Sequence, residues 1–141
     1  MQPVMTPDDL MGFMVEVFPQ VHKDFNVEAV TEDGVRMRLY VTEANLRPGG
    51  TVSGPSMFAL ADVAIYLATL SRIGPEALAV TTNGSIDFMR KPSANTDLIA
   101  EARLLKLGKT LSVGDVLIYS EGVDAPVARA TLTYSIPPKR G

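Results

Sequence analysis

One long apolar segment most constrains how this chain can fold. Residues 57–70 are apolar at nearly every position, and the only charged side chain among them is that of Asp62. A Gly-Pro pair stands just before this segment at 54–55, and another follows it at 74–75. Proline is tolerated in the first turn of a helix, whereas a glycine followed by proline ends one. A helix that is apolar all round is buried, so the rest of the chain must supply a shell around it.

Most of the remaining sequence has the character of β-strands, so the shell around the helix is predicted to be a β-sheet. Residues 35–41 alternate between apolar and polar side chains after an Asp-Gly turn signal, and a shorter strand precedes the turn at about 26–31. Consecutive strands after a single helix favour an α+β fold with an antiparallel sheet that curls around the helix. We expect Gly84 to form a bulge in the first of the later strands. Those strands are predicted at about residues 78–89, 98–107, 111–119 and 127–136.

The length of the chain, 141 residues, fits one domain. We therefore expect a single domain over residues 1–141. Apolar residues recur at helical spacing after Thr6, a good N-cap, and this predicts a helical extension within residues 1–24. Residues 137–141 are expected to form a flexible tail.

The composition argues against several classes of protein. The chain has no cysteine and one histidine, and no set of carboxylates has the spacing of metal ligands. We therefore expect no metal and no cofactor. The net charge is −3 without long runs of one sign, which disfavours a nucleic-acid partner. The chain begins without a basic leader, and residues 57–70 are too short to cross a bilayer, so we expect a cytoplasmic protein with no membrane partner.

Three short motifs follow one another in a recognisable order. The apolar segment reads Leu-Ala-Asp-Val-Ala over residues 60–64, the loop before it reads Ser-Gly-Pro at 53–55, and a strand ends with an aromatic, basic residues and proline at 88–92. This order resembles the hotdog-fold acyl-CoA thioesterases of the phenylacetic-acid-degradation group. These carry a His-Gly-Gly loop followed by Leu-x-Asp-x-Ala on the central helix, and only the glycine at 54 matches their loop. The resemblance covers about residues 25–136 and implies the hotdog fold, an antiparallel curved sheet wrapped around one long helix.

The resemblance also implies a reaction, the hydrolysis of an acyl-CoA or related thioester to acid and thiol. Asp62 would be the catalytic carboxylate, acting as a general base for water or as a nucleophile on the carbonyl. The backbone N–H of Gly54 would bind the developing oxyanion at the start of the helix. Thr81, or Thr82 beside it, would position the water from the partner subunit, whereas Asp62 and Gly54 would belong to one chain. The residues alone leave open a solvated Asp62, or one paired with an arginine such as Arg47.

Further polar residues are candidates for binding the substrate. A basic cluster beside the pocket could hold the CoA phosphates, although single lysines also protect sheet edges from aggregation. A serine just before a helix is also a strong N-cap. The substrate-binding candidates are Arg47, Ser53, Thr82, Arg90, Lys91 and Lys109.

The family resemblance implies a homodimer or homotetramer in which the edge of the strand at 78–89 pairs between subunits. Other functions remain open. The departures from the His-Gly-Gly loop favour a non-catalytic module that binds acyl-CoA or another acyl ligand. An enoyl-CoA hydratase is disfavoured because the central helix has no histidine, and a structural oligomer would fill its pocket with its own side chains.

Overall fold

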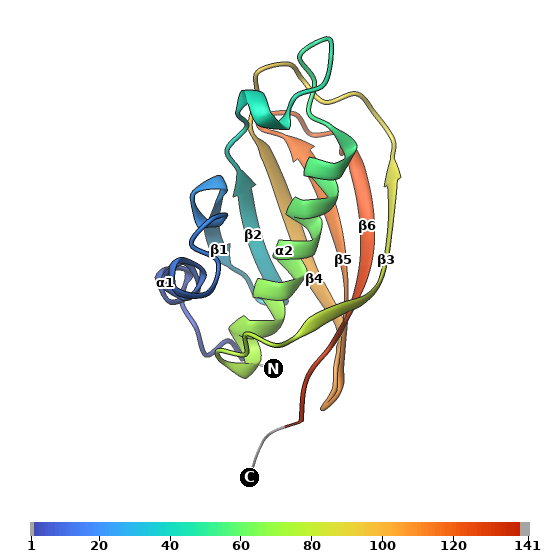
Figure 1. Cartoon of the computed structure of the whole chain (residues 1–141). Coiled ribbons are helices and arrows are strands. Elements are labelled where there is room, and N and C mark those ends of the chain that lie inside the picture. The colour runs from blue at the N-terminus through green and yellow to red at the C-terminus, as the bar shows by residue number, and fades with distance from the viewer. Residues whose placement is uncertain (1, 139–141) are drawn as a thin grey trace.

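The protein consists of one curved sheet wrapped around a long helix, α2 (Figure 1). The computed structural model describes residues 2–138. Six strands form an antiparallel sheet in the order β1-β2-β4-β5-β6-β3. The helices are α1 (Pro7–Val17), α2 (Gly54–Ile73) and the short 3-10 turns η1 (His22–Asp24) and η2 (Glu43–Asn45). The strands are β1 (Phe25–Val30), β2 (Gly34–Leu39), β3 (Val80–Phe88), β4 (Leu98–Leu107), β5 (Leu111–Ser120) and β6 (Ala128–Ser135).

This architecture confirms the predicted α+β hotdog fold. One detail differs, because the irregularity in β3 lies between Thr81 and Asn83 and makes Thr82 the extra residue, while Gly84 pairs regularly with Leu132. A Cβ atom at Gly84 would lie 3.0 Å from the ring of Phe58 on α2. The glycine thus lies close against the Phe58 ring, which a side chain at this position would push aside, and the prediction of a bulge at that residue was wrong.

Helix α2 forms the centre of the hydrophobic core. Its side chains Leu60, Ala64 and Leu67 are completely buried. With 20 residues the helix is long and apolar enough to span a bilayer, but 67% of its most apolar window is buried inside the domain. The helix extends beyond the predicted segment 57–70 at both ends, so the argument that its length rules out a membrane span was wrong. Its burial inside the sheet accounts for its apolar character.

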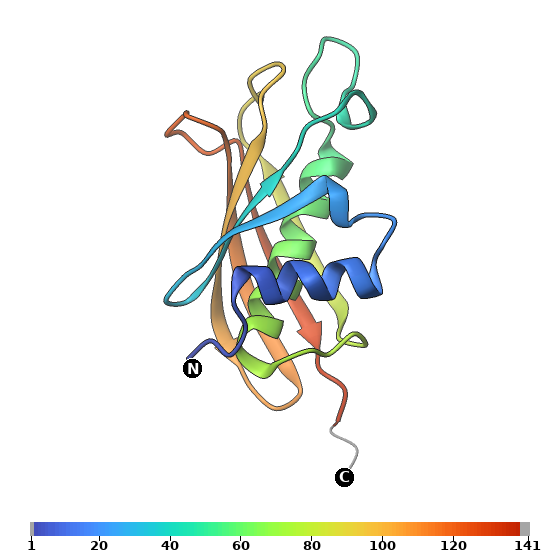
Figure 2. The same ribbon diagram turned by 90° about the vertical axis from the view of Figure 1, so that its left-hand side faces the viewer.

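Helix α1 packs beside β1 and crosses α2 (Figure 2). A capping box starts it, because Thr6 Oγ1 accepts from Asp9 N at 3.1 Å and Thr6 N donates to the Asp9 carboxylate at 2.9 Å. Leu10 and Met14 lie under the helix with 0% and 1% of their surface exposed. Of the predicted tail 137–141, residues 139–141 lie outside the described residues.

Candidate active site

Asp62 lies on the third turn of α2 and faces strands β3 and β6. Thr81 Oγ1 donates to Asp62 Oδ1 at 2.6 Å, and the phenol of Tyr134 donates to the same oxygen at 2.8 Å and to the Asp62 carbonyl at 3.1 Å. Thr81 and Tyr134 are partners across the β3–β6 pairing, so the two donors stand side by side. Within residues 2–138 no group donates to Oδ2. One carboxylate oxygen is thus fixed in place, and the other is available for chemistry.

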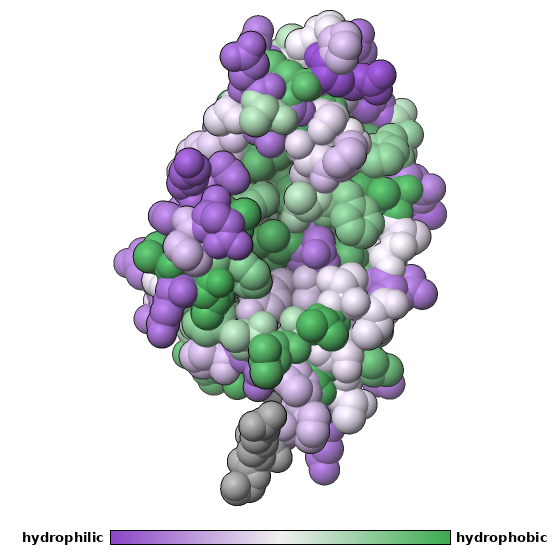
Figure 3. All heavy atoms as spheres, viewed as in Figure 1, coloured by the Kyte–Doolittle hydropathy of each residue, from purple (hydrophilic) through white to green (hydrophobic). Residues whose placement is uncertain are grey.

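An open pocket of about 430 Å³ lies beside this carboxylate. Figure 3 shows apolar side chains gathered over α2 and its surroundings on this face. The lining is mostly apolar or aromatic and comes from the end of α1, from α2, from the start of β3 and from β6. The lining residues are Met14, Phe18, Gln20, Val21, Asp62, Val63, Tyr66, Ala79, Val80, Thr81 and Tyr134.

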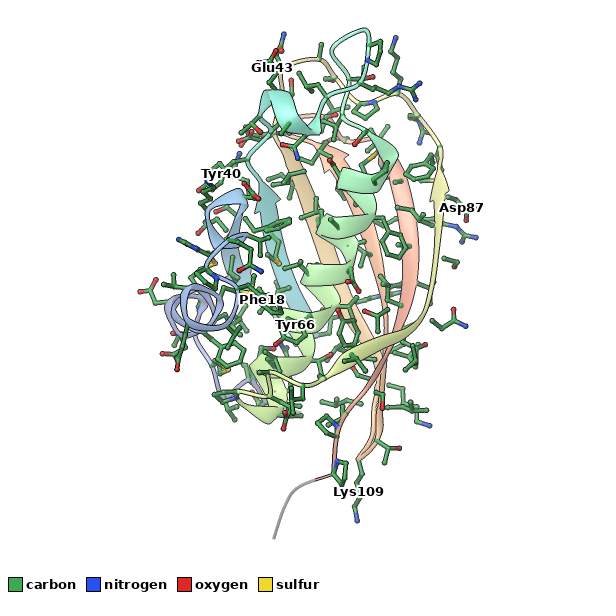
Figure 4. The ribbon with its side chains drawn as sticks, in the orientation of Figure 1. Phe18, Tyr40, Glu43, Tyr66, Asp87 and Lys109 are labelled. Carbon is green, nitrogen blue, oxygen red and sulfur yellow. The ribbon has the colours of Figure 1, made fainter. Side chains whose placement is uncertain are left out.

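Three aromatic rings connect the end of α1 to Asp62. The ring of Phe18 meets Tyr66 edge-on at 5.9 Å between centroids, and Tyr66 lies against Tyr134 at 5.8 Å. Figure 4 shows Phe18 and Tyr66 lying close together in front of α2. Burial raises the pKa of Tyr66 to about 12. Burial also raises the pKa of Tyr134, and the negative charge of Asp62 raises it further. Both phenols are therefore protonated at neutral pH, and Tyr134 is available as a donor to Asp62.

Ser53 caps the start of α2, as its position before the helix indicated. Its backbone is extended, and its hydroxyl accepts from Ser56 N at 3.3 Å. Asn45 braces this turn, since its carbonyl accepts from Ser53 N at 2.7 Å and its Nδ2 donates to Ser56 Oγ at 3.2 Å. Asn45 was not among the predicted site residues, because an asparagine in a loop has no local signature of a contact with the start of a helix 11 residues later.

Gly54 and Asp62 do not form one site within one chain. They are eight positions apart on α2, and the helical rise separates them by about 12 Å, too far to contact one thioester carbonyl. The expectation that one chain supplies both is therefore corrected. The expectation that Thr81 beside Asp62 belongs to the partner subunit is corrected too, because Thr81 of the same chain donates to Asp62. A Cβ at Gly54 would instead lie 3.0 Å from the ring of Phe88. Along the contact between α2 and β3, Phe88 thus lies at the Gly54 end and Thr81 at the Asp62 end.

The remaining predicted residues divide between the two ends of the molecule. Arg47 is exposed, and none of its described contacts involves Asp62. Arg90 and Lys91 are also exposed, just after β3, at the same end as the Arg47 loop and the start of α2 (Figure 1). Lys109 lies at the opposite end (Figure 4), so it cannot share a phosphate with them in one chain. Thr82 turns towards β6, where its hydroxyl donates to the Thr133 carbonyl at 3.4 Å.

A metal site is not evident at this pocket. Residues 2–138 contain no group of three or more His, Asp or Glu side chains placed to hold an ion. The chemistry available beside Asp62 is therefore that of a carboxylate, two hydroxyl donors and an apolar wall. Such a set suits proton transfer to or from a reactant held in the pocket.

The thioesterase superfamily model matches residues 49–127. The match covers more than half of the chain, and the chain therefore belongs to the thioesterase superfamily. It includes the start of α2, Asp62, β3, β4, β5 and the loop before β6. The family assignment confirms the resemblance seen in the sequence and places the chain among hydrolases of thioesters.

Several known proteins are similar to this chain. A crystal structure of a "putative thioesterase" from Silicibacter sp. TM1040 is 59% identical, with a TM-score of 0.92 and coverage of 98% of this chain and 96% of the other. The phenylacetic acid degradation protein PaaI from Thermus thermophilus, in a mutant form, is 27% identical, with a TM-score of 0.71 and coverage of 84% and 99%. A Streptococcus mutans protein bound to acetyl CoA is 26% identical, with a TM-score of 0.72 and coverage of 83% and 91%.

A "Putative esterase" of Deinococcus radiodurans is 38% identical over 80 residues. That match covers 57% of this chain and 52% of the relative. The matched region is thus about half the length of the Deinococcus protein.

Proposed function

We propose that this protein hydrolyses acyl-CoA thioesters, with Asp62 activating the attacking water, at a site that two chains build together. The observation that carries the proposal is the Asp62 carboxylate, which is held through Oδ1 by Thr81 and Tyr134 at the edge of an apolar pocket. A carboxylate fixed through one oxygen presents the other in a defined direction, as a general base requires. Membership of the thioesterase superfamily supports the same reaction.

The exposed edge of the sheet supports assembly into a dimer. Strand β3 is nine residues long and, within residues 2–138, pairs with β6 alone, which leaves its outer edge open in this part of the chain. Val80 and Phe88, at its two ends, are 56% and 53% exposed. A long exposed edge strand presents unpaired N–H and C=O groups that readily pair with another strand. A second copy of β3, antiparallel to the first about a two-fold axis, would cover it and extend the sheet across both subunits.

Two-fold pairing also solves the separation of Gly54 from Asp62. Antiparallel pairing centred on the middle of β3 sets the Phe88 end of each strand opposite the Thr81 end of the other. Because Gly54 lies against Phe88 and Asp62 against Thr81, each carboxylate would approach Gly54 of the partner subunit. A dimer would then contain two equivalent sites, each with one helix start and one carboxylate.

The proposed reaction uses these two groups in one step of attack. Asp62 Oδ2 accepts a proton from water, and the hydroxide oxygen forms a bond to the thioester carbonyl carbon. The N–H of Gly54 of the partner subunit donates to the oxygen that becomes negative, where the helix dipole also favours negative charge. The C–S bond then breaks, and the CoA sulfur leaves with the proton that Asp62 returns. The step requires only water, so a chelator should not reduce the activity.

A pair of exposed basic residues is the proposed binding site for the CoA phosphates. Arg90 and Lys91 follow β3, beside the Arg47 loop and the start of α2. Their charges would attract the phosphates while the thioester reaches the start of the helix. Replacing Arg90 and Lys91 by alanine should raise KM more than it lowers kcat, and the effect should weaken at high salt.

The reaction is tested with a panel of acyl-CoA thioesters, using release of free thiol as the readout. The chain has no cysteine, so a thiol reagent detects CoA alone. Turnover that Asp62→Asn abolishes supports the proposal. If acyl-CoA raises the melting temperature but no thiol is released, the protein is instead a non-catalytic acyl-CoA-binding module.

A further inference from the structure

The wall of the pocket farthest from β3 comes from outside the segment that defines the family. The superfamily match begins at residue 49, whereas Met14, Phe18 and Val21, at and beyond the end of α1, line the pocket beside Asp62. We infer that this N-terminal segment forms the end wall of the acyl pocket and that Phe18 sets the length of the apolar acyl group it accepts. The inference rests on the proposed thioesterase function and adds a specificity-determining residue to it.

The wall is fixed in place rather than loosely attached. Backbone hydrogen bonds surround Phe18, whose N–H donates to Met14 O at 2.8 Å and whose carbonyl accepts from Val21 N and His22 N at 3.0 Å each. At the other end of the segment, Val4 N donates to Ser71 O near the end of α2 at 2.6 Å. Burial of Met14 beneath α1 adds apolar packing. A ligand therefore meets Phe18 as a defined surface.

The position of Phe18 determines what it would meet. Its ring packs edge-on against Tyr66, Tyr66 packs against Tyr134, and Tyr134 donates to Asp62. These aromatic side chains extend from the catalytic carboxylate to the end of α1. A thioester carbonyl placed at Asp62 would direct its acyl group along this apolar surface towards Phe18. The chemical class that fits is an apolar acyl group of limited length, because a longer chain would collide with the Phe18 ring.

The wall is tested by replacing Phe18 with alanine and measuring kcat/KM for acetyl-, octanoyl- and palmitoyl-CoA. The wild-type protein should prefer octanoyl- over palmitoyl-CoA. Phe18→Ala should raise the palmitoyl-to-octanoyl ratio by about tenfold or more, since a few methylene groups in an apolar pocket change specificity on this scale. Phe18→Leu keeps an apolar side chain and should shift the ratio in the same direction by less. This milder variant tests the inference even if Phe18→Ala does not fold.

A matched control comes from the same helix. Val15 on α1 is 50% exposed and does not line the pocket, so Val15→Ala should leave the ratio unchanged. An unchanged ratio in folded Phe18→Ala and Phe18→Leu proteins would overturn the inference while leaving thioester hydrolysis intact.

A second readout separates this inference from the proposed function. Octanoic and palmitic acids bind the pocket without any reaction, and the shift they cause in melting temperature can be compared between wild type and Phe18→Ala. If the wild type hydrolyses no thioester but Phe18→Ala gains stabilisation by palmitic acid, the reaction is wrong and the pocket wall stands. If the wild type hydrolyses no thioester and Phe18→Ala leaves the acid-induced shifts unchanged, both the reaction and the pocket wall are wrong.

Discussion

At one end of the contact between α2 and β3, Asp62 accepts hydrogen bonds from Thr81 and Tyr134 beside an apolar pocket. At the other end the same helix begins at Gly54 beneath the ring of Phe88, near the exposed Arg90 and Lys91 that follow β3. The first end holds a proton acceptor and room for an acyl group. The second has backbone N–H groups that the helix itself cannot satisfy. The Asp62 end thus supplies a proton acceptor but no free backbone N–H groups, and the Gly54 end supplies such N–H groups but no proton acceptor.

In the proposed mechanism this difference makes a single chain an incomplete catalyst. The carboxylate and the helix start are separated by about 12 Å along a rigid helix, so no side-chain movement brings them together. A two-fold axis through the middle of β3 would do so without changing either chain. In the proposed enzyme the open strand edge is therefore part of the catalytic machinery.

Removing the carboxylate should have the largest effect at the Asp62 end. Asp62→Asn keeps the size of the side chain but removes the base, so kcat should fall by about 10²–10⁴. Steady-state thiol release measures it. Asp87→Asn is a matched control, because Asp87 pairs with Arg129 at 2.9 Å on the exposed outer face of β3, and kcat should stay within about twofold. Equal activity of Asp62→Asn and wild type would show that this end is not catalytic.

Removing the backbone N–H of Gly54 tests the role of the start of α2. Gly54 is the first residue of α2, where proline is tolerated, so Gly54→Pro deletes the proposed oxyanion donor while the helix is retained. We expect kcat to fall by about 10²–10³. Gly54→Ala keeps the N–H but sets a Cβ 3.0 Å from Phe88, so it measures the effect of bulk alone. Equal losses in the two variants would mean that crowding, and not the N–H, matters here.

The two hydroxyl donors to Asp62 should contribute less. Tyr134→Phe and Thr81→Val each remove one hydrogen bond to Oδ1, and each should lower kcat by about tenfold, because a hydrogen bond to a charged group contributes ~1.5 kcal/mol. Tyr119→Phe, on β5 away from the pocket, is the control. Unchanged kcat in both single variants and in their combination would show that Asp62 needs no fixed orientation.

The smallest effect concerns stability rather than turnover, and it arises at the Asp62 end alone. Burial raises the pKa of Tyr66 to about 12 and also raises that of Tyr134. Above pH 10 the unfolded chain therefore loses protons that the folded chain keeps, so the free energy of unfolding should be constant with pH just below 10 and fall as the pH approaches 12. Urea unfolding across this pH range measures the decrease in the free energy of unfolding. The double variant Tyr66→Phe and Tyr134→Phe should show a smaller decrease.

Much of the fold was predictable because its signals are local. The apolar segment around Asp62 indicated a buried helix, and the alternation after Gly34 indicated a half-buried strand. The prediction of a bulge at Gly84 was wrong because this glycine instead lies against Phe58, a residue 26 positions earlier that comes close to it only in the folded chain. A contact of that kind has no local signature.

The site was predictable only in part, for the same reason. Asp62 and Thr81 were found through a motif and its spacing, and the structure brings them together. Tyr134 was missed, because a tyrosine in an alternating strand looks like ordinary core until its register against Thr81 is known. Lys109 was grouped with Arg90 because both are basic and follow strands, but the hairpin between β4 and β5 carries it to the far end.

Complementation between two inactive variants tests the central claim most directly. Asp62→Asn and Gly54→Pro chains are unfolded, mixed in equal amounts and refolded, and thiol release is measured. If each site combines Asp62 of one chain with Gly54 of the other, half of the dimers are mixed and each holds one intact site, so the mixture should recover about a quarter of the wild-type activity. If the mixture stays as inactive as the separate variants while mixed dimers are present, the shared site is contradicted.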